Sequence, residues 1–398
     1  MNLSKCFQKK NILHYIGHAY NDIYFLILPL LLPFIKSEFN LNYFQSGLIL
    51  TSHIGIRSLF SYISGHLGDK YDKRIIISFG FVFSSIFMAG LVLANTYTTV
   101  FISLFIMGIG VAAFHPLATA LVGEEAESEH RAFQIGIFET IGASGIIIAS
   151  ITFGFFVGNW GWRQTCLVLA VPGLPLALAY LRMRKEEIDN KMKAEEKVDR
   201  YYILSFILGR GIRALGMGAV VSFLPTYAEE YMGLTGGAAS WTMTLYFAGI
   251  IIGNLGGGWI ADNKTPLLMI AYSTFSTIFV LLGITYIQVT GIALFLITIL
   301  GISHGGFFTP QNSWLTTVST QSTRGKIMGA AFFIDGISVT LAPTIFGWVA
   351  DQVGLDGSFK WMIVPVAVSV IIFFRLYYLE NKDELSYRNS LLETVSNN

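Results

Sequence analysis

The feature that most constrains this chain is a series of apolar stretches, each about 20 residues long, with few charges inside them. An α-helix of about 20 residues spans the hydrocarbon core of a bilayer. Charged residues make up 13% of the chain, well below the roughly 25% of soluble domains. We therefore predict an all-α integral membrane protein. The twelve predicted spans are 11–35, 43–64, 75–94, 99–121, 132–157, 163–183, 201–228, 239–261, 266–288, 291–316, 327–350 and 359–380.

A charged loop between two spans recurs in the second half of the chain. The sequence G-H-L-G-D at Gly65–Asp69 is followed 193 residues later by G-W-I-A-D at Gly258–Asp262. Residues 32–39 likewise match 224–231 at a shift of 192. A period near 193 is too long for a solenoid. It indicates a membrane protein built from two parallel halves.

The polar stretches predict the domain boundaries and the orientation. Residues 1–183 are expected to form an N-terminal six-helix bundle and 201–398 a C-terminal six-helix bundle with a short cytoplasmic tail. Residues 184–200, rich in Lys and Glu, form a cytoplasmic linker between them. Most Lys and Arg residues then lie on the side of both termini, which is therefore the cytoplasmic side. The net charge of +1 predicts no nucleic-acid partner.

Three motifs resemble those of a known family. The loop at Gly65–Arg74 (G-H-L-G-D-K-Y-D-K-R) and the six-plus-six repeat resemble the major facilitator superfamily over essentially the whole chain. Asn21-Asp22 followed by L-P-L-L-L-P at 28–33, and Gly110–Pro116 (G-V-A-A-F-H-P), resemble its fosmidomycin-resistance branch. The resemblance implies twelve transmembrane helices in two pseudo-symmetric bundles. It also implies a secondary active transporter of the bacterial cytoplasmic (inner) membrane.

The resemblance leaves the direction of transport open. Asp72 stands where the family loop usually has Gly, and Leu104 where drug antiporters have Arg. The leading hypothesis is proton-coupled export of a small amphipathic or anionic molecule by a monomer without a cofactor. The alternative is proton-coupled uptake of an organic anion or a siderophore-like metal chelate. A third hypothesis is an intramembrane enzyme that uses His14, His18, His53 and His115 as metal ligands, although no further metal-binding motif supports it.

Three carboxylates within predicted spans are the candidate proton carriers. They are Asp22, Glu139 and Asp335 in spans 1, 5 and 11. A charge inside a membrane is costly, so it faces a cavity or a partner and usually serves function. The structural alternative for Asp22 is an ion pair with Arg57 at nearly the same depth in span 2.

Polar residues at the middle of the spans are the candidate substrate ligands. Arg210 and Arg213 lie on one face of span 7 and correspond, at the repeat shift, to His18 and Asn21. Transporters of this type bind substrate where the halves meet, and two guanidinium groups suit a carboxylate or phosphate. The alternative is that Glu139 or Asp335 neutralises them. The candidates are His18, Asn21, Arg57, His115, Arg210, Arg213, His304 and Gln311.

The repeated loops are the candidate gates. Their glycines are expected to allow close helix approach, and an Asp favours the positive end of a helix. The family resemblance implies that these loops latch the halves together in the outward-facing state. A loop that only fixes topology is the alternative. The candidate gating residues are Gly65, Asp69, Arg74, Arg131, Gly258, Asp262 and Arg324.

Overall fold

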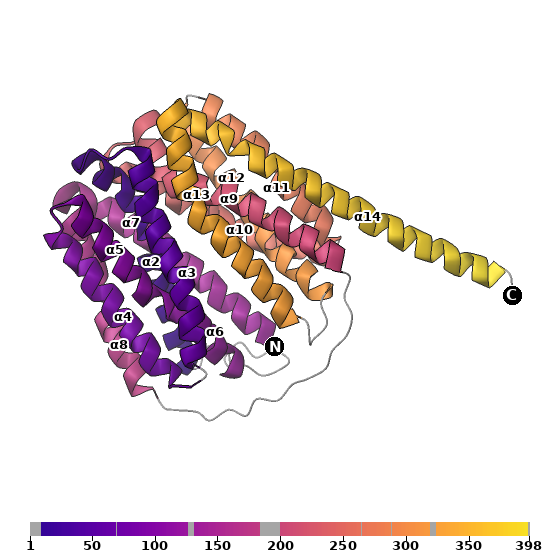
Figure 1. Ribbon diagram of the computed structural model, residues 1–398, viewed down its shortest axis with the longest axis horizontal. Coiled ribbons are helices and arrows are strands. Elements are labelled where there is room, and N and C mark those ends of the chain that lie inside the picture. Colours follow the sequence, from indigo (N-terminus) through magenta and orange to yellow (C-terminus); the bar gives the residue numbers. More distant parts are fainter. Residues whose placement is uncertain are drawn as a thin grey trace.

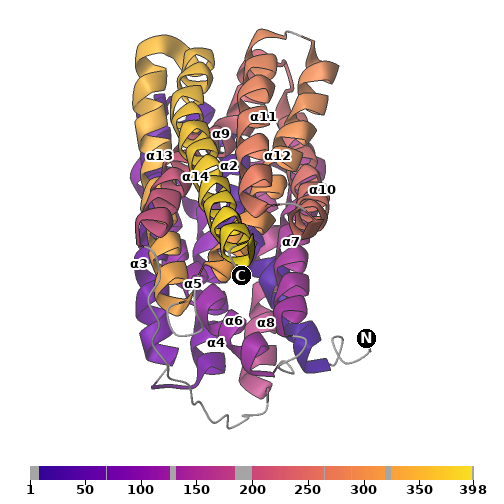
Figure 2. The same cartoon turned by 90° about the vertical axis from the view of Figure 1, so that its right-hand side faces the viewer.

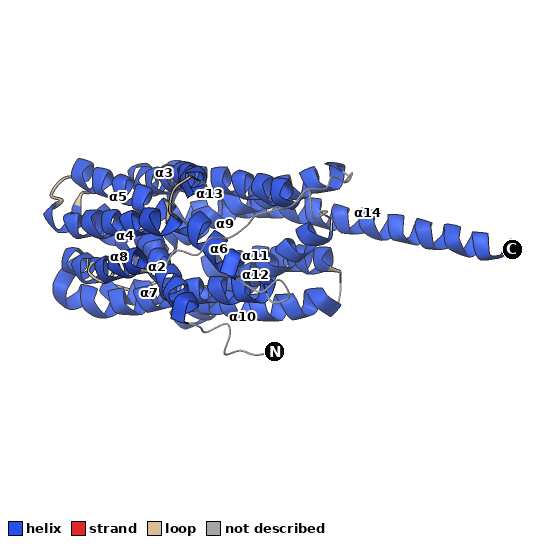
Figure 3. Cartoon of the chain, turned by 90° about the horizontal axis from the view of Figure 1, so that it is seen from below, coloured by secondary structure: helices blue, strands red, loops and turns tan. Residues whose placement is uncertain are grey.

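The computed structural model describes residues 9–68, 70–125, 131–183, 200–263, 265–287, 289–318 and 324–396. Within these ranges the chain is helical and contains no strand, as Figure 3 shows. The helices of the first half are α2 (Lys9–Glu38), α3 (Tyr43–Gly68), α4 (Lys73–Gly90), η1 (Leu91–Leu93), α5 (Tyr97–Ala112), α6 (Phe114–Glu125), α7 (Arg131–Ala170) and α8 (Gly173–Arg182).

The second half begins with α9 (Arg200–Tyr231). Figures 1 and 2 show its helices, coloured pink to yellow, as one group beside the indigo-to-magenta helices of the first half. The remaining helices are η2 (Gly236–Ser240), α10 (Trp241–Asn263), α11 (Pro266–Tyr286), α12 (Thr290–Thr317), α13 (Arg324–Trp361) and α14 (Ile363–Ser396). The C-terminal end of α14 extends beyond the rest of the bundle (Figure 1).

Nine segments of the described chain are long and apolar enough to cross a membrane. Two of them, Thr140–Arg182 and Ile327–Lys382, have 43 and 56 residues and each suffices for two crossings. Each reverses at a glycine with positive φ, Gly161 at 75° and Gly354 at 79°. This backbone conformation is accessible to glycine without a steric penalty. With α3, whose 26 residues are also long enough, this assignment gives the twelve predicted crossings, although hydropathy alone does not establish that number.

The two reversals also support the internal repeat, since Gly161 and Gly354 are 193 residues apart. The membrane-spanning all-α class is confirmed. The boundaries at 183 and 201 stay a prediction, because residues 184–199 of the linker lie outside the described residues.

The halves contact each other through two related helix pairs. Gly47 of α3 packs so closely on Pro343 of α13 that a Cβ atom would collide with its carbonyl. Gly237 of η2 packs in the same way on Gly154 of α7. Beside the second pair, the hydroxyls of Ser150 and Thr244 lie 2.8 Å apart. At the repeat shift of 193, Gly47 and Pro343 correspond to Ser240 of η2 and Ser150 of α7, so corresponding helices form the two contacts.

A polar contact closes one end of this interface. Asp351 of α13 accepts hydrogen bonds from the backbone N–H groups of Tyr43 and Phe44 at 2.9 and 3.1 Å, so it caps α3 across the interface. Glu230 of α9 pairs with Lys36 of α2 at 3.0 Å. With the predicted orientation, this is the outer end of the interface.

The gating predictions are only partly covered by the structure. Asp69 lies outside the described residues, as do the side chains of Arg131, Asp262 and Arg324 and the surroundings of Gly258. The close approach predicted at Gly65 is wrong for this conformation, because nothing lies within 4 Å of the position of its Cβ atom. The other glycine of this loop, Gly68, makes the expected close approach, against Leu117 of α6. Arg74 bonds to Asp72, which caps α4, so Asp72 stabilises the loop in place of the usual glycine.

Candidate functional site

A break between α5 and α6 places His115 against α2. The α-helix is interrupted at Ala113, and Pro116 follows in the first turn of α6, where proline's missing N–H is tolerated. The corresponding Pro310 lies inside the continuous helix α12, so this break has no counterpart in the second half.

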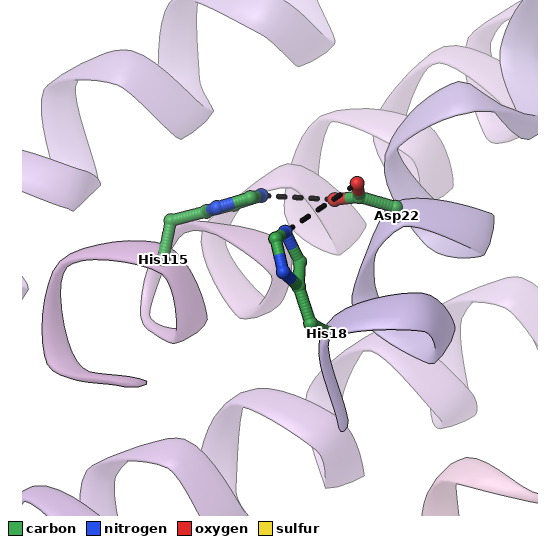
Figure 4. A group of neighbouring side chains, drawn as sticks. All are labelled: His18, Asp22 and His115. Carbon is green, nitrogen blue, oxygen red and sulfur yellow. Dashed lines mark hydrogen bonds and ion pairs between the residues drawn. The ribbon is translucent and has the colours of Figure 1, made fainter. Parts of the chain in front are cut away.

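His115, His18 and Asp22 form one cluster, shown in Figure 4. Nε2 of His115 lies 2.9 Å from Oδ1 of Asp22, and Nε2 of His18 lies 3.5 Å from Oδ2. The two imidazole rings meet edge to face with centroids 4.8 Å apart. Both carboxylate oxygens of Asp22 therefore face imidazole nitrogens.

Two contacts fix the ring of His18. Its Nδ1 lies 2.8 Å from the backbone carbonyl of Phe138, and its ring stacks on that of Phe138 with centroids 3.9 Å apart. Because a carbonyl oxygen only accepts hydrogen bonds, Nδ1 of His18 is the donor. The Nε2 atom then faces Asp22 with a lone pair unless His18 is protonated.

Arg57 does not form the ion pair expected with Asp22. Its guanidinium lies over the ring of Phe25, 3.7 Å from the centroid, and among the described residues no ion pair joins it to Asp22. The imidazoles of α2 and α6 take both oxygens of Asp22, and an aromatic face attracts a cation. Arg57 still acts on Asp22 electrostatically through space. The predicted direct pair is therefore wrong.

The second half has an excess of buried cations. Arg210 and Arg213 of α9 are 1% and 2% exposed. Nε of Arg210 donates to Oδ2 of Asp335 at 2.6 Å, while its Nη1 and Nη2 atoms have no hydrogen-bond partner among the described residues. Arg213 lies over the ring of Phe307 at 3.9 Å, and its Nε and Nη2 atoms also lack a partner within the described part of the chain. Among these side chains, two guanidinium groups therefore face one carboxylate.

Helix α12 adds polar groups beside Arg213. His304 and Gln311 flank Phe307 at i−3 and i+4 and so share its face. His304 bonds through Nδ1 to the hydroxyl of Tyr246. Gln311 is buried, and its Oε1 atom has no hydrogen-bond partner among the residues that the structure describes. The structure thus gathers these two predicted ligands with Arg213 in the second half.

The predicted residues separate into two groups, one in each half. His18, Asp22 and His115 meet in the first half, and Arg210, Arg213, Asp335, His304 and Gln311 lie in the second. Asn21 is buried, and its amide nitrogen has no hydrogen-bond partner in the described part of the chain. The side chain of Glu139 lies outside the described residues, so its role stays a prediction.

Sequence reasoning missed the aromatic ring that lies beneath Arg213. Aromatic residues make up 14% of the chain, so nothing in the sequence distinguishes Phe307 from the others. Tyr246, the partner of His304, was missed for the same reason. Phe25 carried a signal, because it lies three residues after Asp22 in span 1.

Comparisons with known proteins agree with the repeat and the fold. The family model described as Major Facilitator Superfamily matches residues 16–211 and again 206–393. The cis,cis-muconate transport protein of Acinetobacter baylyi is 21% identical over 82% of this chain and 83% of its own length. The fosmidomycin resistance protein of Escherichia coli is 23% identical over 62% of this chain and 64% of its own.

A solved structure shares the fold. It is a bacterial homologue of the human lysosomal transporter Spinster in an inward-facing, unoccupied conformation, with a TM-score of 0.82 and 17% identity. The match covers 94% of this chain and 97% of that one. These relatives are membrane transporters, so the protein is a transporter and the hypothesis of an intramembrane enzyme is wrong. Both halves match the same family model, and the chain therefore belongs to the Major Facilitator Superfamily.

Proposed function

We propose that this protein is a secondary active transporter that carries a small organic anion together with protons by alternating access. The observation that carries this proposal is the excess of buried positive charge on α9. Two guanidinium groups lie almost fully inside the protein, and among the described side chains only Asp335 pairs with either of them.

The unpaired N–H groups of these arginines define the substrate chemistry. A buried donor without a partner costs about 1–3 kcal/mol, and more when it is charged. A carboxylate or phosphate accepts two parallel hydrogen bonds from a guanidinium group, which a neutral molecule does not match in charge. Gln311 adds a buried amide to the same region. An anionic substrate would therefore offset the desolvation of Arg210 and Arg213.

Asp335 provides a route from anion binding to proton binding. It accepts a hydrogen bond from Arg210, for which a substrate anion would compete. A proton on Asp335 removes its negative charge and leaves Arg210 for the substrate. Proton and anion then favour each other's binding, and by linkage this preference is mutual. We therefore propose Asp335 as the proton carrier, ahead of Asp22 and Glu139.

A carrier that binds proton and anion together favours symport of the two over exchange of one for the other. In an exporter driven by exchange, proton and substrate would instead compete for the carrier. The pairing of Asp335 with Arg210 supports uptake of an organic anion with protons, rather than the export favoured by the sequence motifs. The relative named for cis,cis-muconate, an organic acid anion, agrees with this substrate class.

Transport into proteoliposomes tests this function. Radiolabelled carboxylates, beginning with cis,cis-muconate, should accumulate when the pH outside is lower than inside, and a protonophore should abolish the accumulation. A thermal-shift screen of carboxylates, each matched with its neutral methyl ester, selects the probes, because a ligand of the folded state raises its melting temperature. Equal stabilisation by acids and esters would contradict an anion site.

We further propose that the protein acts as a monomer in the bacterial cytoplasmic membrane, with both termini in the cytoplasm. The distribution of Lys and Arg supports this orientation. In a background without Cys6 and Cys166, a cysteine at Thr96 should react with an impermeant maleimide in intact cells. A cysteine at Asp189 should react only after permeabilisation. The reverse pattern would overturn the orientation.

A further inference from the structure

The cluster of His18, Asp22 and His115 has the composition of a metal site. One imidazole nitrogen from each histidine and one oxygen of Asp22 lie within 4.8 Å of one another. Two bonds of about 2.1 Å in a tetrahedral site place ligand atoms about 3.4 Å apart. The two Asp22 oxygens lie 2.9 and 3.5 Å from the two nitrogens, close to that separation, and the widest pair of ligand atoms, within 4.8 Å, would close by at most about 1.4 Å on binding.

The orientation of His18 is a second, independent observation. Its Nδ1–H donates to the carbonyl of Phe138, so in the neutral ring Nε2 presents a lone pair to Oδ2 of Asp22. Two acceptors 3.5 Å apart need a positive charge between or on them. Metal-binding histidines are held by such a hydrogen bond from the other ring nitrogen to a carbonyl or carboxylate.

The surrounding packing keeps the ring in that orientation. His18 lies against Phe138 on one side and Phe114 on another. Gly142 of α7 leaves the space that the ring occupies, because a Cβ atom there would lie 2.5 Å from Nε2 of His18. His18 is therefore fixed before any ion binds, while His115 is half-buried and free to adjust.

We propose that His18, Asp22 and His115 bind one divalent transition-metal ion, with Zn²⁺ and Co²⁺ as the best fits. Two imidazoles and one carboxylate are the ligands that these ions accept in three-residue sites, and they leave a further position for water or another ligand. Ca²⁺ and Mg²⁺ prefer oxygen ligands and are disfavoured. The inference is independent of the proposed transport function.

Arg57 limits the affinity of this cluster for a metal ion. It acts on Asp22 through space and would repel a cation bound there. Asp22 contributes one negative charge, so a bound divalent ion leaves net positive charge inside the membrane. We therefore expect Arg57→Gln to bind Zn²⁺ more tightly than the unmodified protein.

Titration of the purified, tag-free protein in detergent tests the site. Calorimetry with ZnCl₂ and absorption spectroscopy with CoCl₂ should show one ion bound per chain. His115→Gln and Asp22→Asn should each weaken Zn²⁺ binding at least tenfold and abolish the visible Co²⁺ bands. His115→Gln is the primary variant because its side chain is 26% exposed and its loss is least disruptive to packing.

His53→Gln is the matched control. His53 is also buried and also bonds through Nδ1 to a backbone carbonyl, that of Leu104 at 2.8 Å, but it is outside the cluster. It should bind Zn²⁺ within twofold of the unmodified protein. Melting curves without metal confirm that each variant is folded. Absence of Zn²⁺ binding, or binding that survives both His115→Gln and Asp22→Asn, would overturn the proposal.

Discussion

The two halves carry opposite chemistry at corresponding places in the repeat. His18 of α2 corresponds to Arg210 of α9. In the first half, a carboxylate is enclosed by two imidazoles, an arrangement that suits a cation. In the second half, two guanidinium groups face one carboxylate, an arrangement that suits an anion. The duplicated fold thus preserves helix positions and interface contacts while the buried charges diverge, so charge preference belongs to each half separately.

The largest expected effect is the loss of coupling in Asp335→Asn. The neutral side chain mimics a protonated carboxyl and leaves Arg210 for the substrate at every pH. A pH gradient should then no longer drive accumulation of the anion, while exchange of internal for external substrate should persist. Uptake and counterflow in proteoliposomes measure the two activities.

Asp356→Asn is the matched control for that change. Asp356 lies on the same helix, α13, but it bonds to Tyr227 and Lys360 at the outer end. Its variant should retain accumulation driven by the pH gradient. Retained accumulation in Asp335→Asn would mean that Asp335 is a structural partner of Arg210, and Asp22 or Glu139 would become the carrier.

Titrating one variant from each half with both ligands sharpens this comparison. Asp22→Asn should weaken Zn²⁺ binding at least tenfold but change the affinity for an organic anion less than twofold. Arg210→Gln should do the reverse, because a charge-assisted hydrogen bond contributes about 1.5–3 kcal/mol. Calorimetric titration of both variants with both ligands gives the four affinities. A large loss of anion affinity in Asp22→Asn would show that the two clusters form one site.

A smaller effect is expected at the outer contact between the halves. Asp351→Ala removes the cap that α13 supplies to α3. Losing a helix cap costs about 1 kcal/mol, or about fivefold in population. Double electron–electron resonance between spin labels at Asn95 and Val289 should show a larger population with the outer ends apart.

Glu38→Ala is the matched control for the outer contact. Glu38 bonds to Trp162 and Arg163, which lie in its own half. Its variant should therefore leave the distance distribution unchanged. If Asp351→Ala also leaves this distribution unchanged, the cap does not hold the outer ends of the two halves together.

The sequence predicted the fold well because bilayer thickness and helix rise determine span length. It also identified charges that the structure buries, since Asp22, Arg210 and Arg213 are conspicuous in apolar segments. It predicted their partners less well. Asp22 was expected to pair with Arg57, but it contacts His18 and His115.

The contact of Asp22 with His115 depends on the break in the helix at Ala113. No single residue type in the sequence predicts that break. The position of Phe307 beneath Arg213 depends in the same way on the packing of α9 against α12. Charges inside a membrane are therefore easier to find from sequence than the groups that neutralise them.

The central claim, an anion site at Arg210 and Arg213, is tested most directly by one comparison of affinities. The measurement is the dissociation constant of Arg213→Gln for a transported carboxylate and for its neutral methyl ester. The account predicts a loss of about tenfold or more for the acid and less than twofold for the ester, with partial recovery in Arg213→Lys. Equal losses for acid and ester would contradict it and make these arginines structural counter-ions.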